Sequence, residues 1–314
     1  MVTTEVEQAR ILDEYDPTSH GFTELMAVPW WRPEAFVAAA EDLAGASAKA
    51  LASDRHPAFG KDVSQDLIAL RLALSDPEQD DLRSLGSDAA DALQSALRGW
   101  TPGERDLDVQ ARAASQLESR GADTPVLIVG GDERLLKYRH PMATGTPMHR
   151  LAMAVVVARR GGLHAAATRF ASAGAIDPDV VSSRRRVLRI DSDILAVCRP
   201  GNTYGDALVA LDAAYEREGA SGGWAGHYQG GPIGFAQREF EVSPEQTDSP
   251  WYSLSMRAGH AVAWNPSLPG GAKVEDTYLI TEEGLERLTD ASDWPLEQSD
   301  DVVPARPAVL DVSG

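Results

Sequence analysis

The chain is poor in cysteine. Its 314 residues include one, Cys198, so a disulfide framework within the chain is excluded and a reducing compartment suits it. Cys198 follows Ile194 and Val197 on one side of an apolar helical pattern. This placement predicts a small buried side chain rather than a nucleophile.

Long apolar runs are also missing. No stretch stays apolar for the ~20 residues that a membrane-spanning helix needs. Residues 1–16 lack the basic flank and the apolar stretch of a signal peptide. We therefore expect a soluble, cytoplasmic protein.

Positive charge is scarce. The chain has 29 Lys and Arg against 48 Asp and Glu, which gives a formal net charge of −19. A surface of that sign repels phosphate backbones and anionic lipids. We expect no nucleic acid and no membrane as partner.

Apolar residues are present in quantity. They make up 43% of the chain, enough for one large domain or a domain with an appendage. Residues 1–61 show broken helical patterns and include the exposed-looking segment VPWWRPEAF. Trp30 and Trp31 are expected to be packing anchors at a domain or subunit contact.

Helical and strand-like patterns alternate after residue 61. Residues 75–100 predict a helix with Asp76 as its cap and Pro77 in its first turn. Its apolar stripe consists of Leu82, Leu85, Ala89, Leu93 and Leu97. A second helix is expected from near Glu104 to Gly121, followed by strands at 125–131, 151–160 and 163–172.

The second half repeats this order. A long helix is expected with a stripe of Val187, Ile190, Ile194 and Val197, and another runs to Gly219. Strand-like segments follow at 226–240, 259–267 and 272–284. The acidic residues 295–314, which include Pro304 and Pro307, predict a flexible tail at the surface.

An internal regularity supports a duplication. Pro102-Gly103 and Pro200-Gly201 each open a helix, and the same 19-residue interval separates Pro102 from Gly121 and Pro200 from Gly219. This period is far too long for a solenoid. It predicts an α+β fold in which two related helix–helix–strand halves share one curved, mainly antiparallel sheet.

Two motifs in the second half resemble the pita-bread superfamily of methionine aminopeptidase, aminopeptidase P, prolidase and creatinase. They are the helix–RPG–helix segment AVCRPGNTYGDALVALDAAYEREG and the closing segment VEDTYLITEEGLERLT, and the likeness runs from about Asp62 to Thr289. The resemblance implies a pita-bread domain at 62–294 and a shortened N-terminal segment at 1–61. Superfamily relatives with an N-terminal domain are often dimers, so together with Trp30 and Trp31 the resemblance implies a homodimer.

The resemblance also implies where metal ligands belong. Peptidase members of this superfamily hold two metal ions with two Asp, one His and two Glu. In this chain Val155, Ala166 and Asn265 stand where two Asp and one Glu are expected, and His227 and Glu275 remain. One neutral amide and two apolar side chains cannot balance two divalent cations. We expect no dinuclear centre, although convergence of His227, Glu239 and Glu275 leaves room for one weakly held ion.

The loop GHYQGGPIGFAQREF is most similar to creatinase, the metal-free enzyme of the superfamily. That likeness implies that His227 is a general acid or base, with Glu275 orienting its imidazole and Glu239 beside it as a third catalytic group. A structural histidine and an exposed strand carboxylate are the alternatives for the first two. In a half-buried strand, we expect Glu275 to face inward and its neighbour Asp276 outward.

Five further residues are candidate substrate ligands. Arg238 suits bidentate recognition of a carboxylate, although a surface ion pair with Glu239 is the alternative. Asn265 can donate an oxyanion-type hydrogen bond. The remaining three are His140, for which turn chemistry is an even alternative, Arg169, which a structural ion pair explains equally well, and Gln229.

Three functions follow from the resemblance. The first is a metal-independent hydrolase or lyase that acts on a C–N bond of a small carboxylated, amino-acid-like substrate. The second is a metal-dependent Xaa-Pro aminopeptidase or dipeptidase with unorthodox ligands. The third is a binding protein that kept the pita-bread groove without catalysis.

Overall fold

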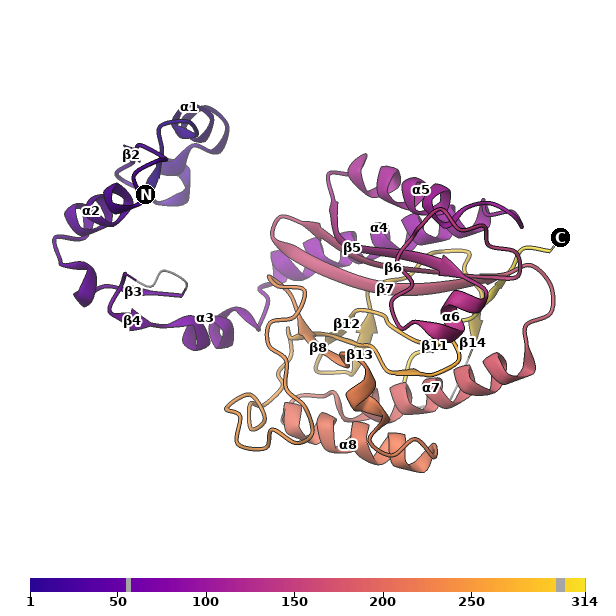
Figure 1. Ribbon diagram of the computed structural model, residues 1–314. Helices are drawn as coiled ribbons and strands as arrows, with labels where there is room; N and C mark the ends of the chain where they lie inside the picture. The colour runs from indigo at the N-terminus through magenta and orange to yellow at the C-terminus, as the bar shows by residue number, and fades with distance from the viewer. Residues whose placement is uncertain (55–57, 298–302, 314) are drawn as a thin grey trace. The chain divides into compact units, whose positions relative to one another are not determined.

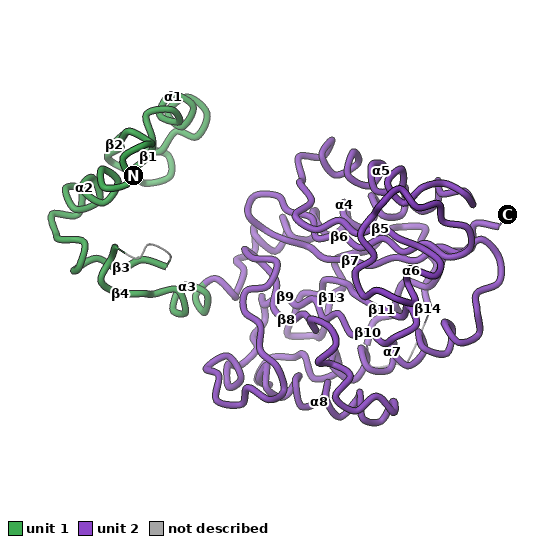
Figure 2. Tube along the Cα trace, in the orientation of Figure 1, with its two compact units in different colours: residues 1–70 green, residues 71–314 purple. Residues whose placement is uncertain are grey.

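The structure is a computed structural model that describes residues 1–54, 58–297 and 303–313. The chain divides into two compact units, Met1–Leu70 and Arg71–Gly314 (Figure 2). This division lies later than the expected one after residue 61, because most of helix α3 (Ser64–Arg71) belongs to the first unit.

The first unit has a small core. Its buried core side chains, among the residues described, are Val28, Ala39 and Ala48. Trp30 and Trp31 are 66% and 57% exposed and contact each other edge to face, so they do not anchor this core. Their role in a subunit contact, and the homodimer itself, stay predictions.

The elements of the first unit are short. Strands β1 and β2 pair in parallel, as do β3 and β4. In chain order the elements before α3 are β1 (Val2–Thr4), α1 (Gln8–Arg10), the π-helical η1 (Ile11–Tyr15), the 3-10 helix η2 (Pro17–His20), β2 (Met26–Val28), α2 (Pro33–Ala44), the 3-10 helix η3 (Ala48–Ala50), β3 (Ala52–Ser53) and β4 (Lys61–Asp62).

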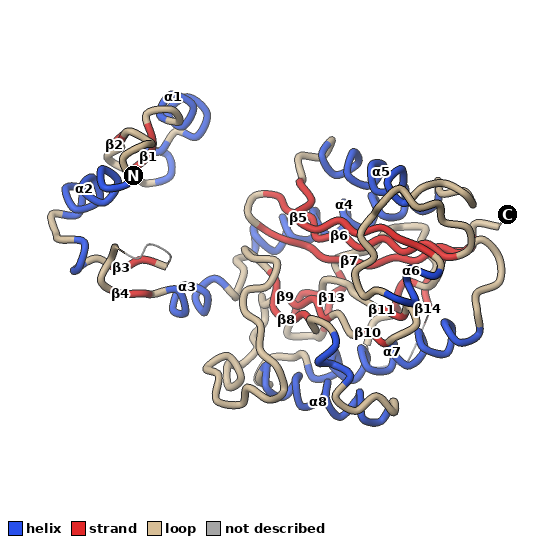
Figure 3. Tube along the Cα trace, viewed as in Figure 1, coloured by secondary structure: helices blue, strands red, loops and turns tan. Residues whose placement is uncertain are grey.

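The second unit places its strands between helices (Figures 1 and 3). Helices α4 (Asp76–Arg98) and α5 (Asp106–Glu118) pack on a sheet of order β16-β7-β6-β5. The long strands of this sheet are β5 (Asp123–Gly131), β6 (Leu151–Arg160) and β7 (Leu163–Ser172). The helix and strands predicted for this half are confirmed.

The other half has a second sheet and a second helix pair. Helices α7 (Pro178–Val197) and α8 (Tyr204–Arg217) pack on each other, and the sheet has the order β13-β12-β9-β8. The remaining elements are α6 (Glu133–Lys137), the 3-10 helix η4 (Gly223–Gly226), β8 (Gly230–Ile233), β9 (Ala261–Trp264), β10 (Ser267–Leu268), β11 (Ala272–Lys273), β12 (Tyr278–Ile280), β13 (Leu285–Arg287), β14 (Leu296–Glu297), β15 (Arg306–Pro307) and β16 (Leu310–Asp311).

Strand β7 joins the two sheets. The backbone N–H of Thr168 donates to the carbonyl of Glu275 at 2.9 Å, and that of His164 donates to the carbonyl of Gly234 at 2.8 Å. Within the two sheets every pairing is antiparallel except that of β16 with β7. The expected mainly antiparallel sheet shared by two halves is therefore confirmed.

The backbone confirms the duplication as well. Gly103 and Gly201 both have φ of +93°, a left-handed conformation that suits glycine. The N–H of Gly103 donates to Met148, and that of Gly201 donates to Met256. An isolated bridge follows two residues later in each half, Arg105 with Pro147 and Thr203 with Ser255.

Two local predictions are wrong. Ser75 rather than Asp76 caps α4, because its N–H and hydroxyl both donate to Glu78, which closes a capping box. The tail is not a loose surface segment in its described part: Leu310 pairs with Ala171 of β7, and Arg306 is fully buried. Residues 298–302 of the predicted tail lie outside the described residues.

Cys198 is buried, as expected. The indole N–H of Trp264 donates to its sulfur at 3.2 Å, and burial raises the pKa of the thiol to about 12. A thiol with that pKa is protonated at neutral pH and does not act as a nucleophile.

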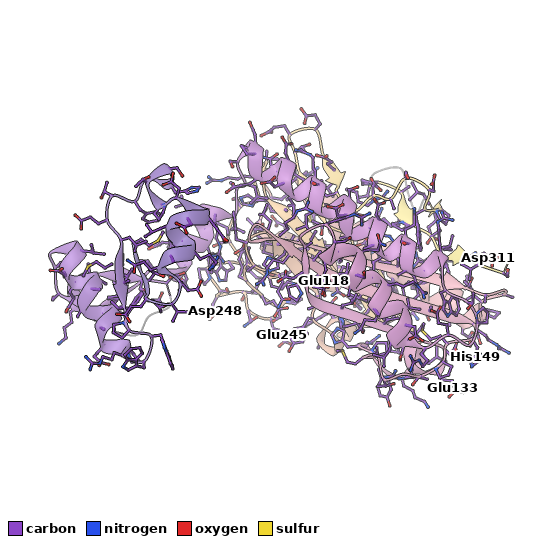
Figure 4. All side chains as sticks on the ribbon, turned by 90° about the horizontal axis from the view of Figure 1, so that it is seen from above. Glu118, Glu133, His149, Glu245, Asp248 and Asp311 are labelled. Atoms are coloured by element: carbon purple, nitrogen blue, oxygen red, sulfur yellow. The ribbon has the colours of Figure 1, made fainter. Side chains whose placement is uncertain are left out.

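Excess negative charge lies at the surface. The labelled carboxylates Glu118, Glu133, Glu245 and Asp248 are all exposed, and His149 is exposed with them (Figure 4).

None of the helices in the described part of the chain is both long enough and apolar enough to cross a membrane.

Candidate active site

A cavity of about 450 Å³ lies in the second unit and combines an apolar wall with a charged one. Strands β5 and β6 supply the apolar wall, whose residues are Val126, Ile128, Val155 and Val157. The polar side is formed by His140, Arg238, Asn265, Lys273 and Glu275. The central cavity, as we call it, therefore collects four of the eight residues that the sequence singles out.

Glu275 is held by three groups. Its side chain is 2% exposed, and its carboxylate accepts from the Thr168 hydroxyl at 3.0 Å and from the Arg238 guanidinium at 3.1 Å. The Lys273 ammonium lies 3.5 Å from the same carboxylate. Burial alone would raise the pKa of Glu275, but Lys273, Arg238 and Thr168 hold it below its usual value, so the carboxylate is ionised.

Lys273 is the residue that sequence reasoning missed. It is 4% exposed, lines the central cavity and precedes Glu275 by two positions on an extended segment. Alternation along a strand places residues i and i+2 on one face, which is the signal that could have found it. Burial lowers the pKa of its amine, and the Glu275 carboxylate limits that fall.

The charges of this cluster do not cancel. Lys273 and Arg238 carry two positive charges, and Glu275 carries one negative charge between them. A partly buried excess of one positive charge attracts an anion because the surrounding dielectric screens it weakly. The part of the central cavity beside Lys273 and Arg238 is therefore suited to one carboxylate group of a ligand, while the exposed Glu241 adds a negative charge elsewhere on the lining.

His140 and His227 form a pair. Their Nε2 atoms lie 3.0 Å apart, so one ring donates an N–H hydrogen bond to the other. Burial, with Lys273 and the other histidine, lowers the pKa of His227 to about 3, and burial also lowers the pKa of His140. Both rings are neutral at pH 7, with a single proton between the facing nitrogens.

The two histidines differ in their positions. His140 lines the central cavity, whereas His227 is not among its lining residues and lies in the loop that follows η4. No hydrogen bond joins Glu275 to His227, so the expected carboxylate that orients this imidazole is replaced by His140. The Nδ1 atom of His227 is buried and has no partner among the described residues.

Asn265 contributes a free acceptor. It is 5% exposed and lines the central cavity, and its Oδ1 atom has no hydrogen-bond partner among the residues described. An unpaired buried amide oxygen costs free energy unless a ligand or water donates to it. Asn265 can therefore accept a hydrogen bond from a ligand here.

Besides His227, three predicted residues do not line the central cavity, namely Glu239, Arg169 and Gln229. Glu239 pairs with Arg71 at 2.6 Å and accepts from the N–H of Ala236, so it fixes the loop after β8. Arg169 is buried against Asp276 at 2.8 Å and donates to the carbonyl of Thr289. Glu239 and Arg169 therefore form structural ion pairs, and neither takes the catalytic or substrate-binding position that was predicted.

Gln229 and Asp276 also have structural partners. The amide of Gln229 donates to the carbonyls of Trp224 and His227, and its oxygen accepts from Tyr215. Gln229 therefore shapes the loop that carries His227 rather than reaching a ligand. Asp276 is 2% exposed and does not face solvent, contrary to expectation.

Comparison with known proteins identifies the family. The pattern of metallopeptidase family M24 matches residues 80–282, which is more than half of the chain. The chain belongs to metallopeptidase family M24. Its pita-bread fold is confirmed by solved structures, while no curated protein matches it.

The solved structures are similar in fold at low identity. The dipeptidase PepE from Mycobacterium ulcerans is 19% identical, with a TM-score of 0.74 over 99% of this chain and 83% of that one. The prolidase from Pyrococcus horikoshii is 18% identical, with a TM-score of 0.67 over 93% and 84%. The X-Pro aminopeptidase from Thermotoga maritima is 15% identical, with a TM-score of 0.69 over 99% and 87%.

The site does not fit the metal centre that the family implies. Val155 contributes a hydrocarbon wall and Ala166 a methyl group where carboxylates would be needed. The described residues contain no group of three or more His, Cys, Asp or Glu placed to hold an ion, so the expected convergence of His227, Glu239 and Glu275 is wrong. The carboxylate of Glu275 forms ion pairs with Lys273 and Arg238 instead.

Proposed function

We propose that this M24 protein binds a small carboxylate in the central cavity and acts on a C–N bond of that ligand without a dinuclear metal centre. The observation that supports this is the cluster of Lys273, Arg238 and Glu275, with its excess of one positive charge. Amino-acid-like and dipeptide-like molecules carry the carboxylate and the nitrogen that the proposal needs.

Binding depends on the charged wall. The Arg238 side chain is 18% exposed and presents its guanidinium at the cavity surface. The Lys273 ammonium, which is more deeply buried, adds a second positive charge to the same wall. A carboxylate accepts charge-assisted hydrogen bonds from such donors, and these are shorter and stronger than neutral ones. The apolar wall of β5 and β6 accommodates the hydrocarbon part of the ligand.

Proton transfer is assigned to the histidine pair. His140 faces the ligand, and its Nε2 contact with His227 lets a proton pass between the cavity and the second ring. The pKa values of His140 and His227 are both lowered, so both rings are weak bases before a ligand binds. A bound carboxylate raises the pKa of nearby imidazoles, so the pair becomes a better base when substrate is present.

A second candidate is hydrolysis of Xaa-Pro peptides. It is favoured by the similarity in fold to a prolidase, a dipeptidase and an X-Pro aminopeptidase. The missing carboxylates at Val155 and Ala166 weigh against it, because the family's chemistry uses them as ligands.

A substrate panel with and without chelator separates the candidates. We would incubate the full chain with guanidino, N-alkyl and N-acyl amino acids and Xaa-Pro dipeptides, and measure product release. Turnover that survives chelation and falls in His140→Gln and Arg238→Gln supports the proposal. Turnover of Xaa-Pro dipeptides that depends on added Mn²⁺ or Zn²⁺ supports the second candidate. Saturable binding without turnover of any compound indicates a binding protein.

A further inference from the structure

A second cavity of about 250 Å³ lies beside the loop that follows α6. The β10–β11 hairpin forms one side of it, and Leu135 and Met153 contribute apolar contacts from α6 and β6. Lys273 is the one lining residue that it shares with the central cavity. The hairpin cavity, as we call it, is therefore a neighbouring but separate space.

Arg139 faces the hairpin cavity without an anionic partner. It is half-buried, and it makes no hydrogen bond or ion pair with any described residue. Burial lowers the pKa of its guanidinium, whereas the pKa values of other arginines, such as Arg83 and Arg189, are raised by carboxylates. A desolvated guanidinium without a counter-ion favours the binding of an anion.

Ser267 provides an independent sign of a ligand. It is 2% exposed and lines the hairpin cavity, and its hydroxyl has no hydrogen-bond partner among the described residues. Its backbone is fixed by Tyr215, whose hydroxyl lies 3.1 Å from the Ser267 carbonyl and 3.0 Å from its N–H. Arg139 and Ser267 both line the hairpin cavity, so one ligand there can meet the guanidinium and the free hydroxyl.

We infer that the hairpin cavity is a binding site for a small carboxylate, held by the Arg139 guanidinium and the Ser267 hydroxyl. The guanidinium matches the planar carboxylate with two parallel donors, and the hydroxyl supplies a third. The ligand is a small acid with an apolar part, because Leu135 and Met153 border the polar groups and the cavity measures about 250 Å³.

The charge of the hairpin cavity favours a carboxylate over a phosphate. Arg139 is its one cation without a carboxylate partner among the described lining residues, since Lys137 pairs with Glu133 at 3.7 Å and Lys273 with Glu275 at 3.5 Å. A phosphate carries more charge at pH 7 than one guanidinium balances. This inference does not depend on catalysis in the central cavity.

Calorimetric titration of the full chain with sodium butyrate tests the site, with sodium phosphate and neutral butyramide as parallel probes. We expect saturable butyrate binding that weakens at least about tenfold in Arg139→Gln and about three- to tenfold in Ser267→Ala. Arg199→Gln is the matched control, because it removes one exposed arginine charge elsewhere and should leave butyrate binding unchanged.

Arg238→Gln separates this site from the central cavity. If the inference holds, butyrate still binds to Arg238→Gln at the hairpin cavity, even when turnover in the central cavity is lost. Equal butyrate affinity in wild type, Arg139→Gln and Ser267→Ala would overturn the inference, and so would the absence of any saturable binding. Phosphate that binds more tightly than butyrate and depends on Arg139 would overturn the assignment to a carboxylate.

Discussion

The two halves of the second unit share a backbone plan but differ in the chemistry of their cavity-facing residues. Gly103 and Gly201 make the same turn with the same φ, and each is followed by a helix. Yet Val155 of the first half adds hydrocarbon to the central cavity, whereas Lys273 and Glu275 of the second half add charge. The fold is therefore maintained independently of its site, because turns and apolar faces do not need the catalytic side chains.

In the second half, side-chain cations of the chain itself take the position beside Glu275 that the family resemblance assigns to metal ions. A carboxylate that could bind a divalent ion is neutralised here by Lys273 and Arg238, which belong to the chain itself. A buried charge is retained only if partners compensate it. The pairing explains why Glu275 can remain buried and ionised without a dinuclear centre.

Removing the carboxylate should have the largest effect. Glu275→Ala leaves Lys273 buried with no counter-ion beside Arg238, so we expect unfolding free energy to fall by about 3–5 kcal/mol. Urea unfolding measures this change. Glu133→Ala, at an exposed carboxylate, is the control and should change stability by less than about 0.5 kcal/mol. Similar values for the two variants would show that the cluster is not a compensated buried pair.

Removing the ammonium should affect binding more than stability. Lys273→Met leaves Glu275 with Arg238 and Thr168, so we expect a smaller loss of stability than in Glu275→Ala. Binding of a small carboxylate to the central cavity should weaken at least about tenfold. Lys49→Met removes an exposed lysine outside both cavities and should bind as wild type does. Unchanged affinity in Lys273→Met would remove this residue from the binding wall.

The histidine pair predicts a pH dependence of stability. The pKa of His227 is about 3 in the folded chain, below the ordinary value near 6.5, so the unfolded chain takes up its proton first as pH falls. Stability from this group is complete above pH 6.5 and is lost between pH 6.5 and about 3. His227→Gln should flatten the fall in unfolding free energy over that window. Parallel pH profiles for wild type and variant would contradict a lowered pKa.

The shared turns should give the smallest effect and an equal one in both halves. Gly103→Ala and Gly201→Ala each force a side chain into φ of +93°, while a Cβ meets no close neighbour at either site. We expect each to destabilise the chain by about 1–2 kcal/mol. Thermal unfolding of the two variants compares them directly, and a cost confined to one half would contradict the structural equivalence.

Sequence reasoning succeeded where the signal was local or periodic. The apolar stripe of α4 was predictable because it repeats with the helical period, and β6 and β7 were predictable because each is a largely apolar run of strand length. The family resemblance added the positions of His140 and Glu275. Alternation along the strand would have added Lys273.

Long-range partners could not be predicted in the same way. Glu239 pairs with Arg71 across 168 positions, and Arg306 with Asp191 across 115, so neither ion pair leaves a local pattern. The role of Glu239 and the order of the tail were misjudged for this reason. The contact between His140 and His227, 87 positions apart, is also visible only in the fold.

The most direct test of the account is a carboxylate titration of chelator-treated protein. Arg139→Gln is the starting chain, because it silences the hairpin cavity and isolates the central one. Calorimetry would compare this chain with its Lys273→Met and Arg238→Gln derivatives, with and without added Mn²⁺. The ligand is a carboxylate that the substrate panel shows to be turned over or bound. We predict that it binds without metal and that either derivative weakens its affinity at least about tenfold. Binding that appears only when Mn²⁺ is added, and that is indifferent to Lys273, would contradict the account.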